Sequence, residues 1–203
     1  TPKPSSAASD VYKRQEQLEA AKAFLDYVDA YKKEGKSEKV ETAFNNAIAN
    51  IGAVYRTRSD EPAVVTQYDR VLSTAVAPPF ERYEFAYQHA RRLLNNKKVN
   101  EAVAMFRKVP KDDKAYNDAQ YYLMVATQQQ LTSMKEKDPK RAATLSELNG
   151  LIDVVNKAMN EQAANEIDPK RKTVARLRLA QTRLLGADVA FRQQKDAARA
   201  VDP

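Results

Sequence analysis

The chain has 203 residues, of which 43% are hydrophobic and 30% are charged, and its formal net charge at pH 7 is +7. This apolar content is enough for a packed core and argues against disorder, and the lack of any cysteine excludes disulfide frameworks and thiolate chemistry. No run of about 18 apolar residues occurs, so the sequence predicts no membrane span in this chain.

The first part of the chain is predicted not to belong to the folded domain. Residues 5–15 read SSAASDVYKRQ, a string that resembles the translation of a transposase-type sequencing adapter over its whole length. We therefore expect residues 1–15 to be adapter-derived and disordered, and the natural N-terminus to be missing; truncation of the C-terminus stays open. Without this segment, which carries three basic residues and one acidic residue, the net charge falls to +5. That is less than a dedicated nucleic-acid binder usually carries.

Helical periodicity covers nearly all of the chain after residue 15. The apolar pattern predicts a first helix over about 18–31 that stops at Gly35, and a second helix over about 40–55 with Ser37 as its N-cap. The SDEP string at 59–62 is typical of the start of a third helix.

Prolines delimit the helices in the rest of the chain. Ala77 and the two prolines after it end the third helix, because the residue before a proline avoids the α conformation. The string YYLMV from Tyr121 has strand propensity, but its flanks are helical, and a bend is expected at Gly186. Further helices are predicted over about 80–95, 99–109 and 115–135, and from the Asp-Pro pairs at 138–139 and 168–169.

The spacing of these breaks indicates internal repetition. Pro79, Pro110, Pro139 and Pro169 are separated by 31, 29 and 30 residues, and the string DPKR occurs at both 138 and 168. A fixed spacing of this kind predicts an array of similar helical units.

One stretch of the chain, residues 83–113, resembles a tetratricopeptide repeat. Small residues lie where the two helices of a unit approach closely, and large apolar residues fill the next gap. Three features depart from the family pattern: Ala86 stands at the position of its tryptophan, Pro110 ends the second helix early, and the later helices are long. The matching positions are Ala90, Leu93, Asn96, Lys97, Ala102, Phe106 and Val109.

This resemblance implies an all-α fold, an α-solenoid of antiparallel helix pairs over residues 16–203, in which each pair buries its open face against the next. It also implies a non-catalytic scaffold that binds a protein or peptide partner on the concave surface of the stacked pairs, where Tyr and Arg are common anchors. Such arrays are common in bacterial envelopes, which is the only indication of a compartment. The expected partner contacts are Glu84, Tyr87, Arg91, Asp118, Tyr121, Val125 and Gln128.

The sequence does not support a catalytic, metal-binding or cofactor-binding site. His89 is the only histidine, and neither a nucleophile nor an orienting group accompanies it. A single histidine without cysteines offers no metal-binding set, and the four glycines lie too far apart for a phosphate-binding loop.

Two other function classes stay open. The basic residues between 170 and 183, among them Arg176, Arg178 and Arg183, could bind a nucleic acid or another polyanion. The chain could also be the non-catalytic part of a larger enzyme.

Overall fold

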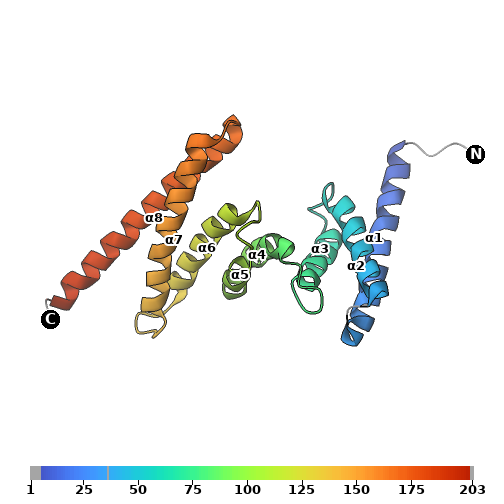
Figure 1. The fold of residues 1–203 in the computed structure, drawn as a ribbon, viewed down its shortest axis with the longest axis horizontal. Coiled ribbons are helices and arrows are strands. Elements are labelled where there is room, and N and C mark those ends of the chain that lie inside the picture. The colour runs from blue at the N-terminus through green and yellow to red at the C-terminus, as the bar shows by residue number, and fades with distance from the viewer. Residues whose placement is uncertain (1–5, 36, 202–203) are drawn as a thin grey trace, which may run out of the picture. The chain divides into compact units, whose positions relative to one another are not determined.

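The computed structural model describes the backbone of residues 6–35 and 37–201 and the side chains of residues 12–35 and 37–193. Within these residues the chain is all-helical, as predicted, and contains no strand (Figure 1). The elements are α1 (Ser6–Tyr31), η1 (Lys32–Glu34), α2 (Glu38–Tyr55), α3 (Pro62–Ala75), η2 (Tyr83–Phe85), α4 (Ala86–Asn95), α5 (Val99–Phe106), α6 (Tyr116–Ser133), α7 (Arg141–Asn165) and α8 (Pro169–Val201), where η denotes a 3₁₀ helix.

The start of α1 differs from the expectation for the first segment of the chain. Residues 1–5 lie outside the described part, whereas 6–15 continue α1 toward its N-terminus as regular helix. Alanine, lysine, arginine and glutamine in this segment are strong helix formers, so a helix does not contradict an adapter origin. The origin of the segment stays a prediction.

Local signals placed several helix ends correctly. The Ser37 side chain accepts a hydrogen bond from the Val40 amide at 3.4 Å and caps α2. Gly35, after η1, has a φ of +96°, a conformation that glycine tolerates best. Pro62 is the first residue of α3, and the Asp168 carboxylate accepts from the Arg171 amide at 2.8 Å at the start of α8.

One predicted helix start is wrong, and the structure shows the surroundings of Gly186. The helix expected from residue 80 begins only at Ala86, because Glu81 has a positive φ of 44° and η2 intervenes. At Gly186, where a bend is expected, α8 continues as α-helix without a break. A Cβ atom at Gly186 would lie 3.2 Å from the Ile152 Cγ2 atom, so this glycine permits the close approach of α7 and α8.

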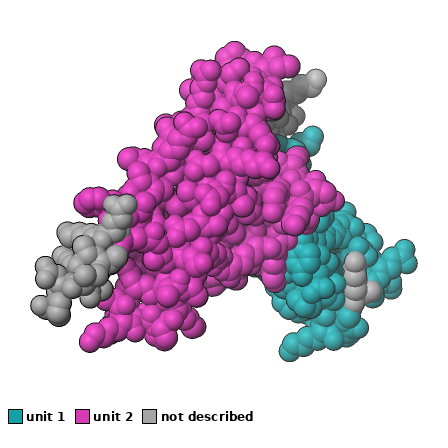
Figure 2. All heavy atoms as spheres, turned by 60° about the vertical axis from the view of Figure 1, so that its left-hand side comes forward, with its two compact units in different colours: residues 1–89 teal, residues 90–203 magenta. Residues whose placement is uncertain are grey.

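The chain divides into two compact units, unit 1 over residues 1–89 and unit 2 over residues 90–203 (Figure 2). In unit 1, α3 packs against both α1 and α2. Their apolar faces form one core with Leu25, Phe44, Ile51 and Val71 at its centre. In unit 2, α6 packs against α5 and α7, and α8 packs against α7.

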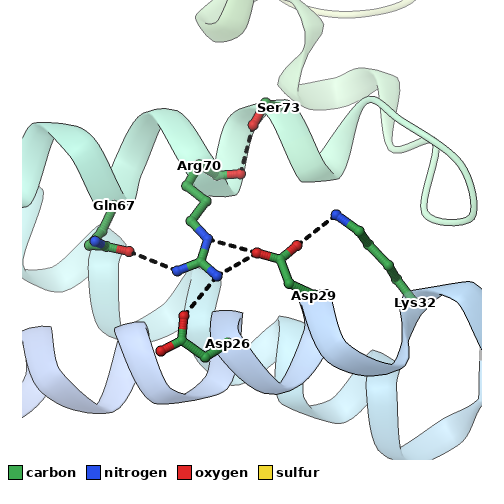
Figure 3. Close-up of polar contacts among 6 residues, drawn as sticks. All are labelled: Asp26, Asp29, Lys32, Gln67, Arg70 and Ser73. Carbon is green, nitrogen blue, oxygen red and sulfur yellow. Dashed lines mark hydrogen bonds and ion pairs between the residues drawn. The ribbon is translucent and has the colours of Figure 1, made fainter.

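An ionic network centred on Arg70 joins α3 to α1 in unit 1 (Figure 3). The Arg70 guanidinium donates to Asp29, at 3.0 Å from Nε, and its Nη2 atom lies 2.8 Å from the Asp26 carboxylate. Lys32 donates to the other Asp29 oxygen at 2.7 Å. Partial burial on its own would raise the pKa of Asp29, but the hydrogen bonds from Lys32 and Arg70 outweigh it and lower that pKa.

Candidate partner-binding groove

Side chains from α6 and α8 meet at two points one turn apart in unit 2. Arg178 forms an ion pair with Asp118, and the Tyr121 hydroxyl donates to the Gln181 side-chain oxygen at 2.6 Å. Both contacts join residues 60 positions apart in the chain. Because the separation is constant, α8 runs beside α6 in the same direction over this stretch.

A cluster of aromatic rings and arginines surrounds this junction. The Arg178 guanidinium lies 5.0 Å from the centre of the Tyr121 ring and 5.6 Å from that of Tyr122. Arg91 of α4 covers Tyr122 at 3.9 Å, and the Phe106 ring stacks on Tyr122 with 6.2 Å between centres. These cation–π and stacking contacts hold the junction in one geometry.

Burial and charge shift the pKa of two groups in this cluster. Burial alone would lower the pKa of Arg178, but attraction by Asp118 and a hydrogen bond to it outweigh burial and raise that pKa. Burial raises the pKa of Tyr121, and its neighbour Tyr122 adds to this effect. Arg178 is therefore a fixed cation, and Tyr121 stays a neutral hydrogen-bond donor.

Beyond the junction, α6 and α8 leave an open groove of about 520 Å³, which we call the α6–α8 groove. It continues into a hollow of about 310 Å³ that shares Gln128, Leu185 and Asp188 with it and also borders α7. The lining of the α6–α8 groove is mainly apolar, with polar groups at its edges. Its residues are Tyr121, Met124, Val125, Gln128, Gln181, Leu184, Leu185 and Asp188.

On the other side of the junction lies a polar hollow of about 540 Å³, the basic end, with cationic residues Lys114, Lys170 and Arg171. Two acidic residues also line it, but both are engaged. Asp118 pairs with Arg178, and the Glu166 carboxylate accepts from the amides of Ile167 and Asp168. The three cations have no ion-pair partner among the described side chains, so the basic end attracts anionic groups.

The groove-side edge of α8 exposes large apolar side chains. Val174, Leu177, Leu184 and Phe191 are 47%, 57%, 73% and 65% exposed. They follow one another at intervals of three and seven residues, so they form one stripe along the helix. Large apolar side chains exposed in a row, rather than singly, mark interaction surfaces.

The structure brings some of the predicted contact residues together and not others. Asp118, Tyr121, Val125 and Gln128 lie along one side of α6 and face α8. Tyr121, Val125 and Gln128 line the groove, but Tyr121 is only 9% exposed and its hydroxyl donates to Gln181 on α8.

The other three predicted residues have different surroundings. Arg91 stacks on Tyr122 next to the junction. Glu84 in η2 is exposed and Tyr87 on α4 is half-buried, and both belong to unit 1. Partner contact by any of these residues stays a prediction.

Sequence reasoning missed the α8 side of the groove, which consists of Gln181, Leu184, Leu185 and Asp188. A signal was available in the 30-residue spacing of the two DPKR strings. Twice that spacing leads from Tyr121 to Gln181 and from Gln128 to Asp188. Periodicity alone did not show that these particular helices lie side by side.

The part of the chain that the structure describes contains neither a metal-binding cluster nor a helix suited to span a membrane. No group of three or more histidine, cysteine, aspartate or glutamate side chains there is arranged to hold a metal ion. None of the helices in that part is both long and apolar enough to cross a membrane. Comparisons with protein-family models, curated proteins and solved structures gave no match to this chain.

Proposed function

We propose that this chain is a non-catalytic interaction scaffold, a tetratricopeptide-like α-solenoid of antiparallel helix pairs, that binds a peptide or protein segment in the α6–α8 groove. The observation that carries the proposal is the groove itself, with an apolar floor, polar edges and a rigid junction at one end. Concave apolar sites with a few fixed polar groups are typical of binding sites.

The 60-residue spacing across the junction supports the solenoid part of the proposal. It equals twice the 30-residue interval between the two DPKR strings at 138 and 168. In an array of helix pairs, the first helices of successive pairs run side by side and line one surface. Here α6 and α8 would be those first helices, and α7 the second helix between them.

Binding of a nucleic acid by the basic residues of α8 has weaker support. Arg178 is one of the residues that would have to contact the nucleic acid, but it is already paired with Asp118 and is only 15% exposed. Arg176 and Arg183 are exposed, but they are seven residues apart on a side of α8 that does not line the groove. The basic residues therefore do not form one continuous face.

The test is selection of peptides from a random displayed library on the purified chain, followed by measurement of their Kd by fluorescence anisotropy. We expect Leu184→Asp, which places a charge in the lining of the groove, to weaken binding at least about tenfold. Leu184 is mostly exposed, so the variant should fold normally, as circular dichroism would verify.

The matched control is Ala190→Asp, which introduces the same charge on the exposed surface of α8 outside the groove. Peptides that bind both variants like the parent chain would show that the groove is not the binding site.

A further inference from the structure

The exposed edge of α8 has the pattern of one half of a coiled-coil seam. Val174, Leu177, Gln181, Leu184 and Asp188 follow at alternating intervals of three and four residues, and Phe191 continues the series. This is the spacing of heptad positions a and d, through which one helix packs against another. Gln181 accepts a hydrogen bond from Tyr121, but the four apolar residues of the series are largely exposed.

Extended peptides fit this pattern poorly. Side chains on one face of an extended chain recur about every 6.6 Å, whereas Leu177, Leu184 and Phe191 recur about every 10.5 Å along α8. A helix with apolar residues at the same seven-residue interval matches that repeat. The occupant that fits is therefore a helix.

The charge of α8 defines the partner further. Between Pro169 and Val201 the helix has nine lysines and arginines but only two aspartates. Lys170 is at the d position one heptad before Leu177, and Arg171 is at the e position beside it. Both belong to the basic end, whose own acidic residues are engaged.

A second copy of α8 is a poor occupant for the same reason. In a parallel pair, Lys170 and Arg171 of one copy would lie against the same residues of the other, and like charges across a seam disfavour the pair. In an antiparallel pair they would lie near Asp188, whose carboxylate already pairs with Arg192. A helix rich in glutamate or aspartate would gain attraction at the basic end, from Lys114, Lys170 and Arg171. Farther along the same edge, Arg178 and Arg192 already pair with Asp118 and Asp188.

We infer that the groove-side edge of α8 binds an acidic amphipathic helix of a partner protein, with apolar residues in its seam and carboxylates at the basic end. This inference rests on the proposed function and narrows it to one class of ligand. From Arg171 to Asp188 the surface extends over about 25 Å at 1.5 Å per residue. A partner helix of about 17 residues would cover it.

The test uses two synthetic peptides of three heptads each, with leucine at positions a and d. One has glutamate at the e and g positions, where self-repulsion keeps it monomeric, and the other has lysine there. Fluorescence anisotropy with the full chain should show binding of the glutamate peptide and binding at least about tenfold weaker for the lysine peptide. The affinity for the glutamate peptide should fall as salt is raised.

Variants locate the contact. Leu177→Asp together with Leu184→Asp should abolish binding, and Lys170→Glu with Arg171→Glu should weaken it at least about tenfold. Arg176→Glu with Arg183→Glu removes the same number of positive charges from c positions, away from the seam, and is the matched control. It should have a much smaller effect.

Three results would overturn the inference. If the glutamate peptide does not bind while library-selected peptides still depend on Leu184, the proposed function stands and the acidic-helix inference fails. If neither kind of peptide depends on Leu184, both fail. If the chain dimerises in sedimentation experiments and Leu177→Asp with Leu184→Asp abolishes the dimer, the occupant is a second copy.

Discussion

Units 1 and 2 each contain three consecutive helices in which an arginine of the third helix pairs with an acidic residue of the first. In unit 1, Arg70 on α3 reaches Asp29 on α1, and in unit 2, Arg178 on α8 reaches Asp118 on α6. The outcome differs, because α3 packs directly against α1 as well as α2, whereas the helix packing of α8 is mainly with α7. A similar ion pair is therefore present in one set of helices that packs without a groove and in another that leaves one.

The side chains near each arginine account for this difference. Val71 and Leu72, which follow Arg70 on α3, are almost completely buried. On α8, Gln181 accepts a hydrogen bond from the Tyr121 hydroxyl, and Leu184 remains 73% exposed one turn later. A shared ion pair therefore does not define a binding surface, since apolar packing around it decides whether the helices close.

The largest expected effect is on the closed set of helices. Phe44→Ala should lower the free energy of unfolding by about 3–5 kcal/mol, because a fully buried ring that packs on Phe80 at 4.4 Å between centres leaves a cavity. Urea denaturation followed by circular dichroism measures this change. A loss below about 1 kcal/mol would mean that unit 1 is not closed around this ring.

Arg178 should matter more to stability than Arg70, because it is more deeply buried. Arg178→Met should cost about 1–2 kcal/mol, since it removes both the ion pair with Asp118, which is itself 37% exposed, and the cation–π contacts with the two tyrosine rings. A double-mutant cycle with Asp118→Asn gives the coupling energy. The same cycle on Arg70 and Asp29 should give a smaller value, and equal coupling energies would remove this difference between the units.

The Arg70 network should contribute a pH-dependent term to stability. The pKa of Asp29 is lower in the folded chain than its ordinary value of about 3.9, so its contribution is present above that pH and is lost as pH falls through the folded pKa. Because Asp29 is about a third exposed, solvent screening limits the contribution to about 0.2–1 kcal/mol.

Urea unfolding of the parent chain and of Asp29→Asn between pH 6 and about pH 2 would measure this contribution. The two stability curves should converge at the acid end. Curves that stay parallel would show that folding does not change the pKa of Asp29.

The smallest effect is expected at the start of α1. Deletion of residues 1–15 should change the free energy of unfolding by less than about 0.5 kcal/mol, because Tyr12 is mostly exposed and residues 13 and 15 are exposed as well. Thermal unfolding with residues 16–203 alone provides the measurement. A drop of several degrees in Tm would show that the segment stabilises the fold of unit 1.

Local chemistry made much of the helical fold predictable. Ser37, Pro62 and Asp168 each act within a few residues of their own position, by capping or by a restricted backbone, and the helices begin where these residues indicate. The start of α4 was predicted wrongly because the left-handed conformation of Glu81 is rare for this residue type.

Only the α6 side of the candidate site could be predicted from the sequence. The α6 side follows from helical periodicity, which places Asp118, Tyr121, Val125 and Gln128 on one face. The α8 side depends on which helices lie next to each other, and periodicity carries no such information. The heptad spacing on α8 was also present in the sequence, but its meaning changes with exposure, since the same stripe could equally have been a buried core face.

Sequence alone thus determined the all-helical class, most helix starts and the excess of positive charge on α8, because these depend on residue type and near neighbours. Tertiary structure alone decided that the Tyr121 hydroxyl donates to Gln181, that Arg178 pairs with Asp118, and that Leu177 and Leu184 remain exposed. These outcomes depend on residues 60 positions apart meeting across a groove, and side-chain packing at that distance sets which groups remain free to bind a partner.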